Sequence, residues 1–148
     1  MAHAPLSAAL PGTWWLLSRI DVSPSGERRP EPSLGEDPIA LLIYDRAGHF
    51  AAQFMRRDRS ALAPDGPTAG KNNSRAQGGY DAYFGTYTVD DQNGTVTQRL
   101  LGSLSQENVG MVLTRAMEVA GDALVIKLGT TAHDGTAVTR TLTWQRVG

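Results

Sequence analysis

Four side chains are suited to moving a proton or to stabilising a developing negative charge: His49, Tyr83, Gln98 and Arg115. Histidine is the side chain whose ordinary pKa lies nearest to neutral pH, so His49 is a candidate general base. The simpler interpretation is a solvated histidine that follows a turn. Tyr83 can donate a hydrogen bond to a carbonyl or phenol oxygen, or it packs between strands. Gln98 can orient a substrate or a water, or it is a satisfied amide of the core.

Two arginines stand among apolar residues at alternating positions. Arg115 is in phase with Leu113 and Met117, and Arg140 is in phase with Leu142. A guanidinium on an apolar face must pair with a carboxylate or meet an anion. Each arginine therefore either serves the structure or contacts a ligand, and the sequence leaves both roles open.

Other positions in the same segments would contact a ligand rather than react with it. Alternation places Tyr83 and Tyr87 on one face of their segment and Tyr80 and Phe84 on the other, so one pair faces the interior. Methionine provides an adaptable apolar wall, although it suits an ordinary core equally well. The candidate contacts are Gln53, Tyr80, Phe84, Tyr87, Met111, Met117 and Trp144.

The composition excludes several kinds of chemistry. Without cysteine there can be no disulfide, thiolate nucleophile, iron–sulfur cluster or thiolate zinc site. The three histidines, His3, His49 and His133, are scattered, so we expect no metal site, and we expect no cofactor. His133 sits in a His-Asp-Gly turn that we expect at the surface. The strand carboxylates Asp81 and Glu118 have no evident partner, and no compact catalytic motif is present.

Charge and hydropathy argue against nucleic-acid and membrane partners. The chain has 14 Lys and Arg residues against 15 Asp and Glu residues, a formal net charge of -1. No apolar run approaches the ~18 residues that a membrane helix needs. The first residues lack the basic region of a signal peptide. We therefore expect a cytoplasmic protein, as a monomer or homodimer, whose partner is a small hydrophobic molecule.

Strands must position these residues, because apolar residues recur at every second position between turn signals. The 148 residues form one domain, with residues 1–11 as a flexible terminus. The proline-rich residues 22–38 must be a loop, residues 56–79 hold at most a short helix, and we expect one of these connections to act as a lid. The eight expected strands are residues 12–21, 39–45, 49–55, 80–90, 95–105, 111–120, 123–131 and 136–147.

Eight meandering antiparallel strands predict an all-β, up-and-down barrel, because closure removes exposed sheet edges. A barrel of this size is filled by side chains or holds one small ligand. Six ordered segments add a resemblance that spans nearly the whole chain. They are GTWWLLS (12–18), LLIYDRAGHFAAQFMRRDR (41–59), AYFGTYTVD (82–90), the stretch from Gly110 to Arg115, GDALVIKL (121–128) and LTWQR (142–146). Together they resemble the bacterial and fungal lipocalin-like domain family, a calycin-type barrel.

The resemblance implies an apolar lumen that takes a small hydrophobic ligand, and it fixes no reaction. It also implies that an arginine, Arg115 or Arg140, packs over Trp14 and closes the base of the barrel. Similar sequences often carry a histidine in the strand after the Asn-Gly turn, where this chain has Gln98. That position therefore cannot supply histidine proton chemistry here.

Three functions remain open at this point. The first is a cofactor-free isomerase, cyclase or lyase that transfers protons on an aromatic, polyketide-like or terpenoid-like molecule. The second is a passive carrier of an apolar small molecule. The third is a filled barrel that acts as a protein-interaction module. An empty lumen with convergent polar groups favours the catalyst, an empty apolar lumen the carrier, and a packed lumen the interaction module.

Overall fold

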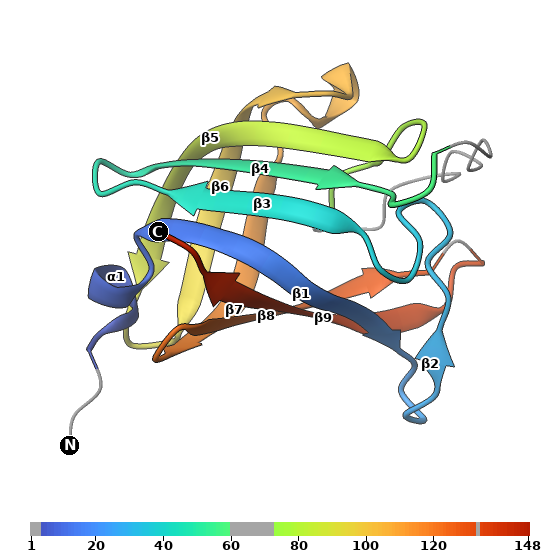
Figure 1. The fold of residues 1–148 in the computed structure, drawn as a ribbon, viewed down its shortest axis with the longest axis horizontal. Helices are drawn as coiled ribbons and strands as arrows, with labels where there is room; N and C mark the ends of the chain where they lie inside the picture. Colours follow the sequence, from blue (N-terminus) through green and yellow to red (C-terminus); the bar gives the residue numbers. More distant parts are fainter. Residues whose placement is uncertain (1–3, 60–72, 133) are drawn as a thin grey trace.

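The computed structural model describes residues 4–59, 73–132 and 134–148, and they form a closed antiparallel barrel (Figure 1). Each long strand pairs with the next one along the chain, and the first pairs with the last, which closes the sheet. This confirms the predicted eight-stranded barrel. The barrel strands are β1 Gly12–Val22, β3 Ile39–Tyr44, β4 His49–Met55, β5 Tyr80–Asp90, β6 Thr95–Ser103, β7 Val112–Ala120, β8 Ala123–Thr131 and β9 Ala137–Arg146.

Three short elements complete the described chain. The connection predicted to be all loop contains β2 (Arg28–Arg29), which pairs with the end of β1. The terminus expected to be flexible contains α1 (Leu6–Ala9), and Leu10 after it is fully buried. The presence of β2 corrects the prediction that this connection is all loop. A 3₁₀ helix, η1 (Gln106–Asn108), follows β6. No helix in the described ranges is long and apolar enough to cross a membrane.

Some of the residues for which the sequence made predictions are not described by the structure. His3, His133 and most of the helix expected near residues 59–63 lie outside the described residues. The described end of that connection, residues 73–79, has no helix and makes one isolated bridge between Gln77 and Tyr80.

Strand alternation and one bulge decide which side chains enter the barrel. On β7 the side chains of Leu113, Arg115 and Met117 are buried, as the period of two requires. On β1 a bulge between Leu16 and Ser18 shifts the phase. As a result Trp14 and Leu16 point inward before the bulge, and Arg19 and Asp21 do so after it.

The base of the barrel lies beside α1 and the C-terminus, at the opposite end from β2 (Figure 1). Trp14 is fully buried there, and its indole N–H donates a hydrogen bond to the Leu10 carbonyl over 3.0 Å. The Arg146 guanidinium lies 4.3 Å from the centre of a Trp14 ring, and it donates hydrogen bonds to the carbonyls of Ala9 and Pro11. Arg146, rather than Arg115 or Arg140, therefore closes the base, which corrects the expectation drawn from the resemblance.

Arg146→Ala should lower the free energy of unfolding by about 2–3 kcal/mol, because it removes charge-assisted hydrogen bonds and a cation–π contact. Urea unfolding at pH 7 measures the change. Arg99→Ala is the matched control, since Arg99 is exposed on the outside of β6. A loss for Arg146→Ala as small as that of the control would show that the base does not depend on this contact.

Candidate functional site

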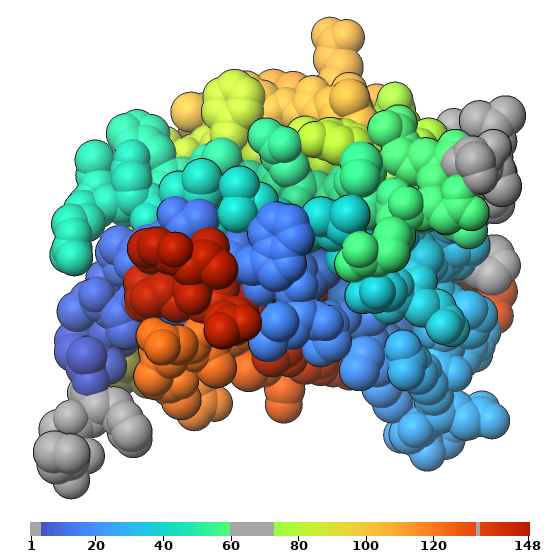
Figure 2. Space-filling view, viewed as in Figure 1, coloured from blue at the N-terminus to red at the C-terminus, as the bar shows by residue number. Residues whose placement is uncertain are grey.

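The barrel encloses a cavity of about 60 Å³ at the end away from α1. On the face seen in Figure 2 the strands close over the interior. The apolar lining residues are Leu34, Leu42, Phe54, Ala76, Ile126, Leu128, Leu142 and Trp144. The polar lining residues are Arg19, Ser33, Tyr44, Asn73, Ser74, Asp81, Tyr83, Gln98, Arg115 and Arg140. The lumen is therefore polar along much of its wall, which corrects the expectation of an apolar one.

Two of the three buried arginines in the lumen have carboxylate partners. Arg140 on β9 binds Asp21 on β1 through two hydrogen bonds, of 2.7 and 2.9 Å, and the two side chains are only 5% and 2% exposed. Arg19 on β1 donates a hydrogen bond of 2.9 Å to Glu31. A buried guanidinium paired in this way has its charge balanced inside the barrel.

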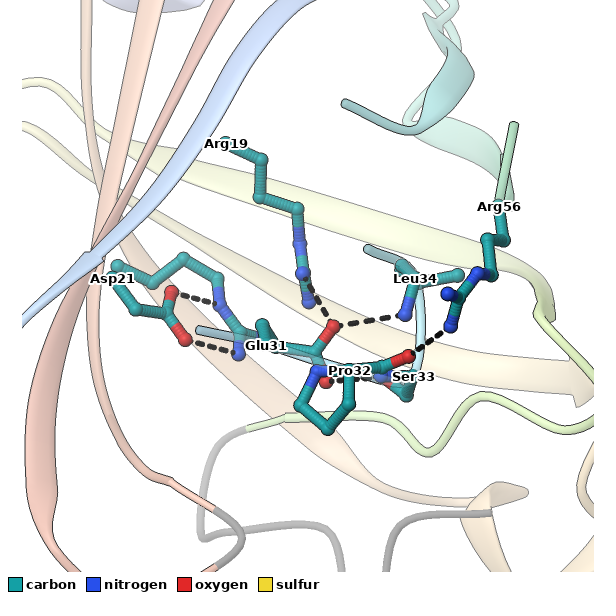
Figure 3. Close-up of polar contacts among 8 residues, drawn as sticks. Arg19, Asp21, Glu31, Pro32, Ser33, Leu34 and Arg56 are labelled. Carbon is teal, nitrogen blue, oxygen red and sulfur yellow. Dashed lines mark hydrogen bonds and ion pairs between the residues drawn. The ribbon is translucent and has the colours of Figure 1, made fainter. Parts of the chain in front are cut away.

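Glu31 belongs to a strap, residues 30–35, that folds back over the lumen (Figure 3). The same carboxylate accepts hydrogen bonds from the Ser33 hydroxyl and from the backbone N–H of Leu34, whose side chain lines the cavity. Arg56, the residue after the end of β4, holds the strap in place. Its guanidinium donates a hydrogen bond of 2.6 Å to the Pro32 carbonyl. Burial by itself would raise the pKa of Glu31, but Arg19 and these hydrogen bonds outweigh it and hold the pKa at about 2.

Arg115 differs from the other two arginines. Its side chain comes from the middle of β7 and the residue is 6% exposed, yet no carboxylate in the described part of the chain forms an ion pair with it. Its hydrogen bond is a long one, 3.4 Å to the carbonyl of the neighbouring Thr114. Burial lowers the pKa of Arg115, but a guanidinium remains charged in proteins. The cavity therefore has a positive charge in its wall without a partner of opposite sign.

Asp81 on β5 is the third carboxyl of the lumen and is 4% exposed. Its Oδ2 accepts a hydrogen bond of 2.5 Å from the Ser74 hydroxyl, while the buried Oδ1 has no hydrogen-bond partner among the described residues. Burial raises the pKa of Asp81 to about 6, against the opposing effect of the Ser74 hydrogen bond. A carboxyl group with this pKa can take up and release a proton near neutral pH.

Aromatic rings form much of the remaining wall. Phe54 packs against Trp144, with ring centres 5.7 Å apart, and against Tyr83 at 6.2 Å. Within the part of the chain that the structure describes, the buried indole N–H of Trp144 has no hydrogen-bond partner. Tyr44 donates a hydrogen bond of 3.1 Å to Gln98. Burial raises the pKa of Tyr83 to about 12, so its hydroxyl stays protonated and able to donate.

The structure brings together part of the site predicted from sequence. Tyr83, Gln98, Arg115 and Trp144 line the cavity. Met117 is buried in the core beside it, where its sulfur lies 3.9 Å from the Tyr44 hydroxyl.

The other predicted contacts lie elsewhere. Tyr87 is half-buried and donates a hydrogen bond to the Asp45 carbonyl near the β3–β4 turn. Met111 precedes β7 and packs against the edge of the core.

Four predicted residues lie on the outer surface, because the inward face carries Phe50 and Phe54 on β4 and Asp81 and Tyr83 on β5. His49 is exposed, with its Nδ1 3.4 Å from Asp45. His49 therefore does not line the cavity. The remaining three are Gln53, Tyr80 and Phe84. The Tyr80 hydroxyl donates a hydrogen bond to Gln53 across the outside of β4 and β5. Phe84 is exposed.

Sequence reasoning missed Arg19, Asp21 and Glu31, and it left Asp81 without a role. The β1 bulge hid the first two, because a fixed period of two does not carry from Trp14 to Asp21. Glu31 lies in a loop and carries no periodic signal. Asp81 was detectable, since it is in phase with Tyr83, which was itself a candidate.

Two comparisons with known proteins bear on this geometry. The sequence model of the lipocalin-like domain matches residues 11–147. None of the curated proteins matches the chain.

Proposed function

The chain belongs to the lipocalin-like domain family, and from that premise we propose that its barrel binds a small organic molecule in the cavity of the lumen. The supporting observation is the convergence of unmet polar groups on one cavity: the Arg115 guanidinium, Asp81 Oδ1 and the Trp144 indole N–H. Buried polar groups in folded proteins nearly always have partners, and a ligand supplies them here.

The apolar and aromatic walls set the character of the ligand. Phe54, Leu142 and Trp144 offer a surface for a flat hydrophobic body of aromatic, polyketide-like or terpenoid-like type. The cavity volume of about 60 Å³ is small beside the ~300–1,000 Å³ of sites for drug-sized ligands. A ligand larger than a few atoms therefore displaces the strap, and opening breaks the ion pair between Arg19 and Glu31.

A proton-transfer reaction, as in an isomerase, cyclase or lyase, is the second part of the proposal, and Asp81 is the observation that favours it over passive carriage. With a pKa of about 6, its carboxylate accepts a proton from the carbon beside a substrate carbonyl and returns it to another atom of the substrate. The Tyr83 hydroxyl donates a hydrogen bond to the oxygen on which negative charge develops. No cofactor takes part in such a step.

Filling the lumen should abolish binding. Leu128→Trp places a larger side chain in the cavity wall, whereas Lys127→Trp places the same side chain outside the barrel on the same strand. Native mass spectrometry of protein purified without unfolding should find a one-to-one small-molecule adduct in the wild type and Lys127→Trp, and none in Leu128→Trp. Circular dichroism checks that both variants fold.

A second readout covers a ligand that is lost during purification. Ligand-observed NMR with indole as a neutral probe should detect binding to the wild type and Lys127→Trp, and not to Leu128→Trp. Equal binding of indole by all three proteins, or an adduct that persists in Leu128→Trp, would contradict binding in the lumen.

A further inference from the structure

The charged side chains inside the barrel are not all paired around the cavity. Three arginines, Arg19, Arg115 and Arg140, line it, and Arg19 and Arg140 are bound to Glu31 and Asp21. Those two carboxylates are therefore occupied, and neither serves Arg115. The charge of Arg115 remains to be matched from outside the described chain.

Asp81 does not neutralise Arg115 either. Asp81 accepts its hydrogen bond from Ser74, and no ion pair joins it to an arginine. Burial raises the pKa of Asp81, and the guanidinium that opposes this effect is that of Arg19. The phenol groups of Tyr44 and Tyr83 act electrostatically on Arg115. Both are neutral, because burial raises their pKa.

An unpaired charge in a protein interior is costly, and an anionic ligand removes that cost when it binds. The guanidinium fork matches a carboxylate in shape, because two parallel N–H groups meet two oxygens. A second negative charge on the ligand would face Asp81 across the same cavity. The site therefore fits one ionised acid group, with the rest of the ligand against the aromatic wall.

We propose that Arg115 binds the carboxylate of the ligand, so that the natural ligand or substrate is a monocarboxylic acid with an apolar body. This inference rests on the proposed binding in the lumen. It assigns to that site a class of ligand, an organic acid, that an apolar barrel would exclude. It also makes Arg115 a ligand-binding residue instead of a structural one.

The test compares benzoate with benzamide, which has nearly the same shape and no charge. Protein-observed NMR titrations at pH 7, at fixed chloride and ionic strength, should give at least tenfold tighter binding of benzoate by the wild type. Arg115→Gln should weaken the binding of benzoate at least tenfold and change the affinity for benzamide by less than about threefold. Arg115→Lys should lie between them, because it keeps the charge and loses the fork.

Arg99→Gln is the matched control, because it removes an exposed arginine from the adjacent strand β6 and should leave both affinities unchanged. Equal binding of the two probes by the wild type, or an unchanged benzoate affinity in Arg115→Gln, would overturn the inference while leaving lumen binding intact. If neither probe nor indole binds and no adduct co-purifies, the proposed function fails and this inference falls with it.

Discussion

Arg115→Met is expected to make the ligand-free protein more stable. Methionine keeps much of the side chain's length and apolar contact while it removes a buried charge that has no carboxylate partner among the described residues. Replacing even a paired buried charge with well-packed apolar side chains is often neutral or stabilising by about 1–4 kcal/mol, and Arg115 leaves no ion-pair partner behind among the described residues. Urea unfolding of ligand-free protein at pH 7 should show a gain of that size.

Arg140→Met is the matched substitution with the opposite expected sign. It removes one member of a pair whose other member, Asp21, is almost fully buried. The lone carboxylate should cost about 3–5 kcal/mol. If both substitutions destabilised the protein to a similar extent, Arg115 would have a structural role and its assignment to a ligand would lose its basis.

The opposite stability changes expected for Arg115→Met and Arg140→Met reflect a trade-off between stability and ligand binding. Arg140 is paired with Asp21, which is part of the chain, whereas under our proposal the partner of Arg115 arrives only with the ligand. Residues that are strained or unpaired in the free protein are typical of binding sites, where function limits stability.

Asp81→Asn should alter how stability depends on pH. The pKa of Asp81 in the folded protein is about 6, and the ordinary pKa of an aspartate in an unfolded chain is 3.8. Between these values the folded state holds more protons than the unfolded state, so the wild type loses stability as pH rises from about 4 to about 6. Asparagine does not titrate, and it keeps a similar shape. The difference in unfolding free energy, variant minus wild type, should therefore rise by about 2–3 kcal/mol over this window.

Urea unfolding at steps between pH 4 and pH 7.5 measures this difference. Glu118→Gln is the control, because Glu118 is exposed on the outer face of β7 and should leave the wild-type curve unchanged. A flat difference for Asp81→Asn would mean that Asp81 titrates normally. The proton-transfer role proposed for it would then lose its support.

The strands and their pairing order were predictable from the sequence because they depend on local patterns. Alternating apolar residues identify a strand with one buried face. Asn93-Gly94 and Gly121-Asp122 mark tight turns, and a tight turn pairs each strand with the next one along the chain. Once eight such strands follow one another, closure is the arrangement that leaves no exposed edge. The inward positions of Gln98, Arg115 and Trp144 follow from the same alternation.

Local sequence patterns were less reliable in showing which face of a strand points into the barrel. In β4 one face carries Phe50, Ala52 and Phe54, and the other carries His49 and Gln53 together with Ala51 and Met55. The apolar face is the buried one, and the candidates His49 and Gln53 were taken from the other face. Phe50 and Phe54 point inward because they pack against Tyr83 from the neighbouring strand, which is a tertiary contact. In β1 the bulge that turns Arg19 and Asp21 inward arises from the register with β9.

The sequence by itself therefore determined the barrel, its strand order and several residues of its wall, because period-two burial and turn chemistry are encoded within about ten residues. The tertiary structure decided the electrostatics of the lumen. Whether a buried arginine is paired depends on carboxylates far away in the chain, as with Asp21 for Arg140 and Glu31 for Arg19. Only that pairing singles out Arg115 as the charge left for a ligand.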